Sequence, residues 1–398
     1  MAMRVQALFT PRCIYHTKKG LRALIALLLL FGLCMPFQVA DAALEVSMED
    51  AAGALLVEAT TQQVLLEQDA DTARSVAGLA KLPAVLVLCE AVDQGKLNLQ
   101  SEIAVSEKAA GVGGPTAFIE GGEVISAEPL MKAAVMICAG DAITALGEAL
   151  SGAESGFVEA INARLAQLGL SVAVENATGA GTQFTPRALA VIGAALMKSP
   201  TFTAHSKLTL ENFSHSDGRE TELVNANRML RSYAGCTGVA TGSAAADGYC
   251  GVFSVTRGDT QLICVVLGCK NSSTRFAAAG SMLDQAFATK KAQKLAEKGE
   301  VIAEGIRVQG GKRREVNLVA KDTVVLLLDK AEPALVAVEQ IPEQLQAPLD
   351  TGAVVGTVSY QTADGVEKGK VELVAQMGVE KAFFREIIRD LLLSFMRL

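Results

Sequence analysis

The order of apolar and polar positions along the chain predicts an α/β domain with a run of helices inserted into it. Apolar segments at 54–58 and 63–66 flank a short polar stretch, which is typical of a β-hairpin. From residue 71 to residue 94 the apolar positions recur at spacings of three and four, as on one buried face of a helix. The same spacing predicts further helices at 127–137, 141–150, 154–168 and 187–197.

The pattern returns to strands in the second half of this region. Residues 239–242, 249–256 and 261–268 are β-rich, and a hairpin turn at 257–260 joins the last two segments. A helix is predicted at 274–291. Two strands, several helices, three strands and a final helix predict one mainly antiparallel sheet with helices on both faces and a helical insertion.

A different pattern follows a polar, lysine-rich segment at 290–298, which we interpret as a domain boundary. Short alternating segments separated by glycine, proline and Asp-Gly turns predict a small all-β domain. They lie at 315–319, 323–328, 334–338, 354–360 and 371–374. We therefore expect a first domain at 43–292 and a second at 300–376.

The N-terminal 42 residues have the pattern of a secretory signal peptide. Lys18, Lys19 and Arg22 precede an apolar run at 23–33, and an Ala-x-Ala cleavage site follows at 40–42. The mature chain is then expected to begin near Ala43 and to be exported. An uncleaved signal anchor is the alternative.

The C-terminal residues 380–398 are predicted to form an amphipathic helix that associates with a membrane surface. Lys381, Arg385 and Arg389 lie on one helical face. Large apolar side chains occupy another face, namely Phe384, Ile387, Ile388, Leu391, Phe395 and Leu398. Docking of this helix on the β-domain is the alternative.

Composition narrows the class of protein. Half of the residues are hydrophobic and 20% are charged, so the chain can bury large cores. Residues 1–42 carry five basic residues and one acidic residue, so removing them changes the formal net charge from -7 to -11. An acidic chain without a basic patch argues against a nucleic-acid partner.

Cysteine and histidine usage indicates no metal site and no cofactor. Six of the eight cysteines follow residue 42, and several lie in apolar runs, so we expect buried free thiols, although an exported protein could oxidise them. The chain has three histidines and no metal-ligand spacing.

Three stretches resemble the D-alanyl-D-alanine carboxypeptidases, which are low-molecular-weight penicillin-binding proteins and serine peptidases. They are LLVEATTQQVLLEQDADTARSVAGLAKLP at 55–83, NANRML at 225–230 and the region from Ala347-Pro348 to Gly356. The resemblance covers nearly everything after Ala43. It implies a penicillin-binding-protein or serine β-lactamase-like α/β domain with a helical subdomain, followed by a small all-β domain. It also implies removal of the terminal D-alanine from peptidoglycan stem peptides.

The motif that supplies the family's nucleophile is Ser-x-x-Lys at the start of a helix. The matching tetrad here runs from Gly78 to Lys81, so the nucleophile position is vacant and the general-base position is kept. Glycine has no atom that can attack a carbonyl, and loss of such a nucleophile costs on the order of 10⁶ in rate. Ser75 lies six residues before Lys81 and is not expected to reach its amine. Lys81 without a serine is either a residual base or a lysine bonded to nearby carbonyls.

The family's two other motifs are also degenerate. Its Ser-x-Asn motif reads Cys138-Ala139-Gly140 here, so Cys138 takes the serine position and Gly140 replaces the amide that would hold the substrate. The aspartate that follows, Asp141, is expected to cap the next helix.

The family's Lys-Thr-Gly motif reads Ala240-Thr241-Gly242. The lysine that would bind the substrate carboxylate is therefore Ala240, while Thr241 and Gly242 remain. Backbone N–H groups of Gly78 and Ser243 are expected to face the oxyanion position.

Three hypotheses follow for the function. The first is an exported pseudoenzyme of cell-wall metabolism that binds or scaffolds, with weak affinity for the peptidoglycan stem peptide or with an envelope protein as partner. The second is an active serine-type carboxypeptidase. The third is a structural partner of a membrane assembly.

Overall fold

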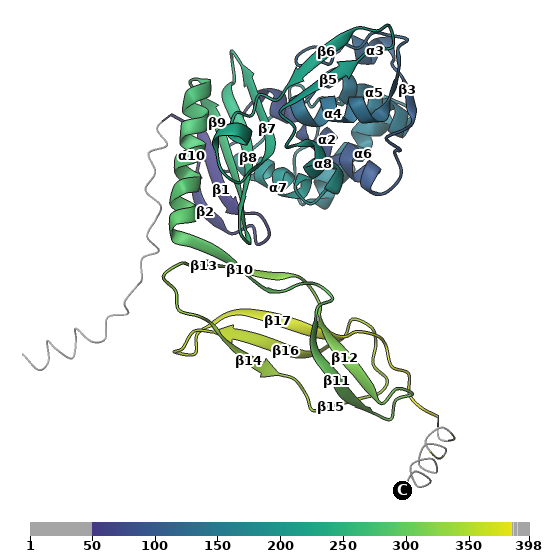
Figure 1. The fold of residues 1–398 in the computed structure, drawn as a ribbon, viewed down its shortest axis with the longest axis vertical. Helices are drawn as coiled ribbons and strands as arrows, with labels where there is room; N and C mark the ends of the chain where they lie inside the picture. Colours follow the sequence, from purple (N-terminus) through teal and green to yellow (C-terminus); the bar gives the residue numbers. More distant parts are fainter. Residues whose placement is uncertain (1–49, 384, 386–387, 389–398) are drawn as a thin grey trace, which may run out of the picture. The chain divides into compact units, whose positions relative to one another are not determined.

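The computed structural model describes residues 50–383 together with 385 and 388 (Figure 1). The predicted signal peptide at 1–42 and most of the predicted tail helix at 380–398 lie outside these residues. No helix in the described part is long and apolar enough to cross a membrane.

A five-stranded antiparallel sheet forms the centre of the first domain, in the order β2-β1-β9-β8-β7. Its first and last strands in the chain lie side by side, with Leu55 opposite Val265. The strands are β1 (Gly53–Glu58), β2 (Val64–Gln68), β7 (Cys236–Ala244), β8 (Gly248–Arg257) and β9 (Thr260–Cys269). The sequence predicted all five, and the antiparallel order with helices on both faces is confirmed.

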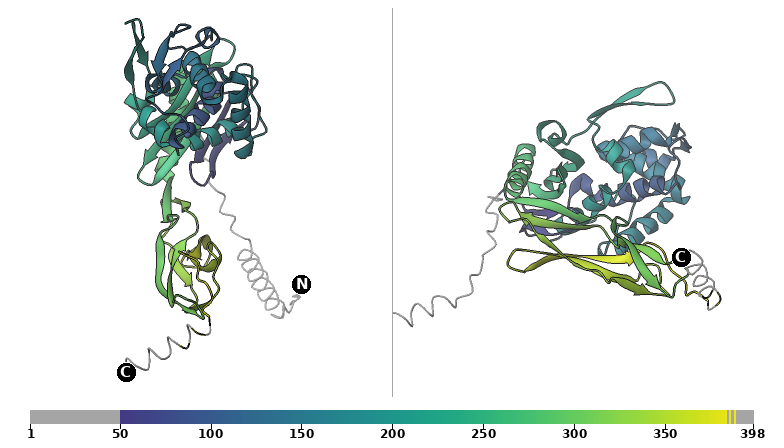
Figure 2. Two further views of the ribbon diagram at one scale, coloured as in Figure 1. Left: turned by 90° about the vertical axis from the view of Figure 1, so that its right-hand side faces the viewer. Right: turned by 60° about the horizontal axis from the view of Figure 1, so that its bottom comes forward.

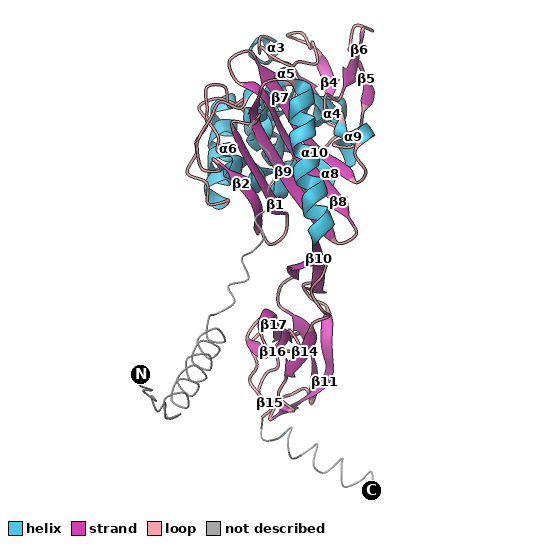
Figure 3. Ribbon diagram, turned by 90° about the vertical axis from the view of Figure 1, so that its left-hand side faces the viewer, coloured by secondary structure: helices cyan, strands magenta, loops and turns pink. Residues whose placement is uncertain are grey.

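Each face of this sheet is covered by apolar helices. The long helix α10 (Ser272–Thr289) lies across one face (Figure 3). On the other face α7 (Pro186–Leu196) contacts β1, β8 and β9. Because β8 and β9 are buried on both faces, they read as nearly continuous apolar runs.

Local caps explain where the covering helices begin. Thr185 accepts a hydrogen bond from Ala188 N at 3.0 Å, with proline at the first helical position of α7. Asn271 does the same for α10 by accepting from Thr274 N at 2.8 Å.

A helical subdomain is inserted between β2 and β7 (Figures 1 and 2). Its helices pack around α2, which contacts α4, α5, α6 and α8. They are α2 (Leu82–Asp93), α4 (Ala127–Ile137), α5 (Gly140–Ser151), α6 (Glu154–Gln167) and α8 (Pro200–His205). The short elements of the same region escaped sequence prediction because they are only three to five residues long. They are β3 (Glu102–Ala104), α3 (Glu107–Ala110), β4 (Val124–Ser126), β5 (Leu210–Ser214), β6 (Glu220–Val224) and α9 (Met229–Ser232).

One expectation about this domain was wrong. The helix expected to open with the tetrad from Gly78 to Lys81 begins as a 3-10 turn, η1, at Ala77–Lys81, and α2 follows from Leu82. Pro83 therefore lies in the first turn of α2, where its missing N–H has no helical partner to lose, and it causes no interior kink. The lysine-rich segment that we interpreted as a domain boundary contains the strand β10 (Lys290–Ala296), which pairs with β13 (Val324–Asp329) and buries Ala292 and Ala296.

The rest of the second domain is a six-stranded sheet in the order β14-β16-β17-β12-β11-β15. Its core includes Leu318, Val371 and Leu373. The strands are β11 (Val301–Gln309), β12 (Glu315–Ala320), β14 (Val336–Gln340), β15 (Gln344–Gln346), β16 (Val354–Gln361) and β17 (Glu367–Ala375). The all-β character is confirmed, although β11 and β15 were not predicted.

The six cysteines between 50 and 383 are all unpaired, which confirms the expectation of free thiols. Five are buried and Cys236 is half-buried. Burial raises the pKa of Cys269 to about 11.

Candidate functional site

A cleft of about 500 Å³ lies between the free edge of β7 and the helical subdomain. Its floor contains Gly78 from η1 and Cys138 from the end of α4. One wall is Ala240 to Ser243 of β7, and the opposite wall comprises the loop 114–118 and residues 221–224 of β6. Six of the eight site residues expected from sequence therefore line one cleft, while Lys81 and Gly140 lie behind its floor.

Gly78 leaves open space in the floor of the cleft. A Cβ placed there would meet nothing closer than the Cα of Gly242 at 3.9 Å, an ordinary van der Waals contact. The preceding residue, Ala77, has a left-handed φ of 50°, which is costly for a residue with a side chain. The turn that would carry the nucleophile is thus present, but residue 78 in it has no side chain.

Gly242 lets β7 approach this turn at backbone distance. A Cβ at Gly242 would lie 2.8 Å from Gly78 N and 3.1 Å from Leu79 N. Real Cβ atoms do not approach so closely, so only glycine fits at this point of the strand. The surviving glycine of the third motif therefore has a packing role that is independent of catalysis.

The Lys81 side chain is buried, with 6% of its surface exposed. Its Nζ would lie 3.3 Å from a Cβ at Gly140 and 3.6 Å from one at Gly114. Burial lowers the pKa of Lys81, and the nearby Cys138 and Asp141 oppose that shift. Bonds to neighbouring carbonyls, the alternative role considered for Lys81, are not found among residues 50–383. A lysine with a lowered pKa is closer to the neutral form that can accept a proton.

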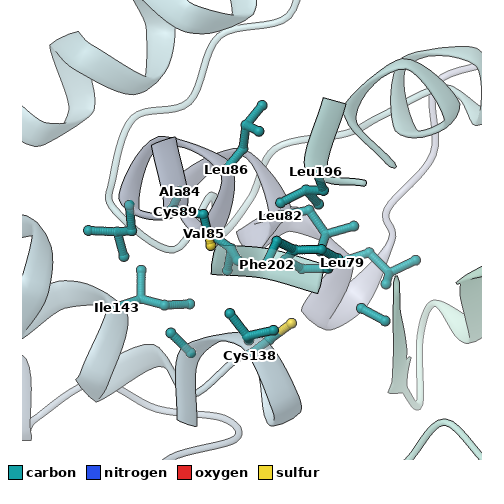
Figure 4. Close-up of a cluster of buried hydrophobic side chains, with 14 of the residues drawn as sticks. Leu79, Leu82, Ala84, Val85, Leu86, Cys89, Cys138, Ile143, Leu196 and Phe202 are labelled. Carbon is teal, nitrogen blue, oxygen red and sulfur yellow. The ribbon is translucent and has the colours of Figure 1, made fainter. Parts of the chain in front are cut away.

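Cys138 is 4% exposed and ends α4 in a left-handed conformation with φ of 51°. It belongs to the buried apolar cluster that includes Leu82 and Phe202 (Figure 4). Burial raises the pKa of the Cys138 thiol, while the positive charge of Lys81 opposes the shift. The thiol is therefore protonated near neutral pH and is a poor nucleophile.

Gly140 leaves no room for a side chain in this structure. A Cβ at this position would lie 2.6 Å from Val112 Cγ1. Val112 thus occupies the space beside Lys81 where the amide of the second motif would lie.

Asp141 is not the cap of α5, because Ala139 is the residue at the N-cap. Its buried carboxylate instead accepts hydrogen bonds from the N–H groups of Ala117 at 2.9 Å, Ile119 at 3.3 Å and Ala142 at 2.8 Å. The first two bonds hold the loop that forms a wall of the cleft.

On β7, Ala240 is buried while Thr241 is half-buried and Ser243 is exposed. No ammonium group replaces the lysine at this strand position. Ser75 is exposed and precedes η1, as expected for a residue that cannot serve Lys81.

Sequence analysis missed Arg275, which extends from α10 to line the cleft. This arginine is 4% exposed, and its guanidinium donates to Gly242 O at 3.2 Å and to Cys250 O at 3.0 Å. Burial lowers the pKa of Arg275, but an arginine remains charged in proteins. The sequence offered one indication of this role, namely an arginine on an otherwise apolar face of the predicted helix. Whether the Arg275 side chain reaches the cleft depends on how α10 packs against the sheet.

The second missed feature is the rim of the cleft around Phe118. This phenylalanine is 65% exposed and has a left-handed φ of 60°. Arg219, in the turn between β5 and β6, forms ion pairs with Glu120 at 3.1 Å and with Glu123 at 2.9 Å. His215 Nδ1 lies 3.4 Å from the same Glu123. These contacts tie the β5–β6 hairpin to the Phe118 loop, so both sides of the rim are held together.

The nucleophile position of the cleft, Gly78, carries no side-chain atom, and the hydroxyl groups of Thr241 and Ser243 lie elsewhere in the lining. The lining is mostly apolar, with Met136, Ile137, Leu223 and Phe118 among its residues. Within residues 50–383, 385 and 388 no group of three or more acidic, cysteine or histidine side chains could hold a metal ion.

Comparisons with protein families agree with this architecture. Residues 40–271 match the D-alanyl-D-alanine carboxypeptidase family, and residues 291–381 match the penicillin-binding protein 5 C-terminal domain.

Individual relatives extend over most of the chain. D-alanyl-D-alanine carboxypeptidase DacF of Bacillus subtilis is 28% identical over 84% of this chain and 87% of its own length. The enzyme DacC of Escherichia coli is 28% identical over 95% of this chain and 96% of its own. Among solved structures, penicillin-binding protein 5 from Haemophilus influenzae superposes with a TM-score of 0.70 at 25% identity, over 83% of this chain and 98% of that one.

Proposed function

We propose, from the premise that this chain belongs to the D-alanyl-D-alanine carboxypeptidase family of peptidoglycan metabolism, that it binds a cell-wall ligand without hydrolysing it. The family is one of serine-type hydrolases. This member keeps the cleft of the family and lacks the serine, so its role is binding or scaffolding.

The single observation that carries the proposal is the open space at Gly78. No side chain from elsewhere enters that space, since a Cβ there would have its nearest neighbour at 3.9 Å. Cys138, which takes the serine position of the second motif, is buried, and burial raises the pKa of its thiol. An active carboxypeptidase would need a nucleophile that neither position supplies.

The means of non-covalent binding remain in the cleft. The free edge of β7 offers backbone groups to an extended peptide, and the apolar wall at Leu223 and Ile137 offers contact area. Arg275 brings a positive charge to the lining of the cleft, which suits a ligand with a terminal carboxylate.

Affinity for a D-Ala-D-Ala terminus is expected to be weak. Gly140 and Ala240 remove an amide and an ammonium contact, together worth about 2 to 4 kcal/mol. Calorimetric titration with a stem pentapeptide should therefore give a Kd weaker than micromolar. The variant Ala240→Lys, which restores the ammonium on the cleft wall, should tighten binding about tenfold or more. Unchanged binding in this variant would place the ligand elsewhere.

Labelling with a fluorescent β-lactam tests the absence of turnover, because acylation requires only a nucleophile and its base. The wild-type protein should give no covalent adduct. A hydroxylamine-sensitive adduct on the wild type would overturn the proposal and favour the active enzyme.

Family members act on peptidoglycan, which is extracytoplasmic, and the sequence of this chain supports the same location. We propose that the segment at 1–42 exports the protein and that residues 380–398 bind it to a membrane surface. Six large apolar residues on one face of that segment, with three cations on another, support this part of the proposal.

A further inference from the structure

The turn between β11 and β12 carries three consecutive cations, Lys312, Arg313 and Arg314. All three residues are exposed. The whole chain has a formal net charge of -7, so this run of basic residues contrasts with its overall charge, and the expectation of a chain without a basic patch was wrong at this turn.

The last described part of the chain is fastened to this turn. Lys312 N donates to Glu380 O at 2.9 Å, and Ala382 N donates to Gly310 O at 2.8 Å. Gly311 and Lys381 form an antiparallel bridge. A cation at position 381 is therefore held beside the cations of the turn by backbone pairing.

Side-chain contacts of Lys312 reinforce the same junction. Its ammonium pairs with Glu380 at 2.5 Å and lies 5.4 Å from the centre of the Phe383 ring. Val379 is 2% exposed and packs where a Cβ of Gly311 would lie. The position of residues 379–383 on the β-domain is thus set by packing and by paired charge.

We propose that this basic turn, defined as residues 312–314 with Lys381, contacts an anionic lipid surface. The proposal rests on the membrane association proposed above for residues 380–398, and it adds a second contact from the folded β-domain. Residues 310–315 and 379–383 together contain four basic residues (Lys312, Arg313, Arg314 and Lys381) and two acidic residues (Glu315 and Glu380), so their formal charge is +2.

Exposed apolar side chains favour a lipid surface over a soluble anion. Phe383 is 69% exposed, and its ring centre lies 5.4 Å from the ammonium of Lys312 in the basic turn. A membrane interface accepts an aromatic group together with cations, whereas a soluble polyanion gains nothing from Phe383. A single interfacial anchor binds marginally, and a basic cluster supplies the second signal for stable attachment.

The test is flotation of the mature full chain with vesicles of phosphatidylcholine alone and with added phosphatidylglycerol. The variant Arg313→Gln/Arg314→Gln should weaken binding to the anionic vesicles about 30-fold, from about fivefold per cation near the surface. Binding to phosphatidylcholine vesicles should stay unchanged. Arg313→Lys/Arg314→Lys should restore the anionic-vesicle binding.

A matched control removes the same charge at the opposite end of the strands. Lys298 precedes β11 and Lys370 lies near the start of β17, and both are exposed. Lys298→Gln/Lys370→Gln should change vesicle binding less than threefold. Equal effects of the two charge-removing pairs would overturn the proposal, because net charge alone would then explain them. Equal competition by a soluble polyanion at matched charge would also overturn it.

Failure of the lipid contact by the turn is distinguishable from failure of the proposed membrane binding by residues 380–398 and of the proposed ligand binding in the cleft. A chain ending at residue 383 keeps the turn and lacks the tail, so any remaining binding to anionic vesicles that the double arginine variant abolishes belongs to the turn. Loss of all binding in the truncated chain would show that the turn needs the tail, and unchanged anionic-vesicle binding of the double arginine variant in the full chain would then overturn the role of the turn. Peptide titration reports on the cleft separately.

Discussion

The substitution Gly78→Ser tests whether the site has lost only its nucleophile. A serine Cβ fits, because its nearest neighbour would be Gly242 Cα at 3.9 Å. The backbone at Gly78 is not left-handed, so a side chain introduces no strain there. Replacing the flexible glycine also lowers the conformational entropy of the unfolded chain, which stabilises the folded protein by about 0.4 to 1 kcal/mol. The variant should therefore fold with unchanged or slightly higher stability.

The expected gain in reactivity follows from the groups still present. A serine at position 78 would be three residues before Lys81, whose lowered pKa favours the neutral amine that can accept the hydroxyl proton. Restoring a nucleophile should recover part of the rate factor, on the order of 10⁶, that loss of a nucleophile costs. The missing amide at Gly140 and the missing ammonium at Ala240 withhold about 2 to 4 kcal/mol, which corresponds to about 30- to 900-fold in rate.

The assay is covalent labelling by a fluorescent penicillin, followed by intact-mass measurement and mapping of the modified peptide. Gly78→Ser should be acylated at position 78 slowly but measurably, and the wild type not at all. Gly78→Ala is the matched control, because it adds the same Cβ without the hydroxyl. Gly78→Ser/Lys81→Met should lose the labelling, because it removes the base.

Two results would refute this reasoning. A folded Gly78→Ser protein that remains unlabelled over hours would mean that the Lys81 amine does not serve position 78. Labelling that survives in Gly78→Ser/Lys81→Met would mean that another group accepts the proton.

Three further predictions concern packing and charge around the cleft. Gly242→Ala should lower the free energy of unfolding by about 1 to 3 kcal/mol, because its Cβ would lie 2.8 Å from Gly78 N. The control Gly78→Ala should leave the stability nearly unchanged, and thermal melting of both variants measures the difference. Gly140→Asn should destabilise through its contact with Val112 Cγ1 at 2.6 Å, and Val112→Ala in the same chain should recover most of the loss in urea unfolding. Lys81→Met should be more stable than the wild type at pH 7 by about 1 kcal/mol, because burial lowers the pKa of Lys81 and disfavours its charge in the folded state. The folded wild type binds its Lys81 proton less tightly than the unfolded chain does, so its stability rises with pH up to the unfolded-state pKa of about 10.4. The stability difference between Lys81→Met and the wild type should therefore shrink between pH 7 and 10. A stability difference that grows over this range would contradict a lowered pKa of Lys81.

Much of the fold was predictable because its signals are local. The spacing of apolar residues in 127–137 and the Thr185 cap before Pro186 determine where helices form without reference to distant residues. The two-sided burial of β8 and β9 is likewise visible as continuous apolar runs. The absence of a nucleophile also follows from sequence alone, once the motif is aligned, since Gly78 carries no side-chain atom.

Which side chains fill and line the cleft depends on contacts between residues far apart in the chain. The spacing of the second motif identifies Gly140, but only packing places Val112, 28 residues earlier, in the space of the missing amide. The position of Arg275 in the cleft depends on how α10 lies across the sheet. The 3-10 conformation of residues 77–81 was not predicted either, and it occurs where Gly242 of β7 closely approaches Gly78 N. Periodicity describes which face of an element is buried, whereas the neighbour that covers this face is selected by the whole fold.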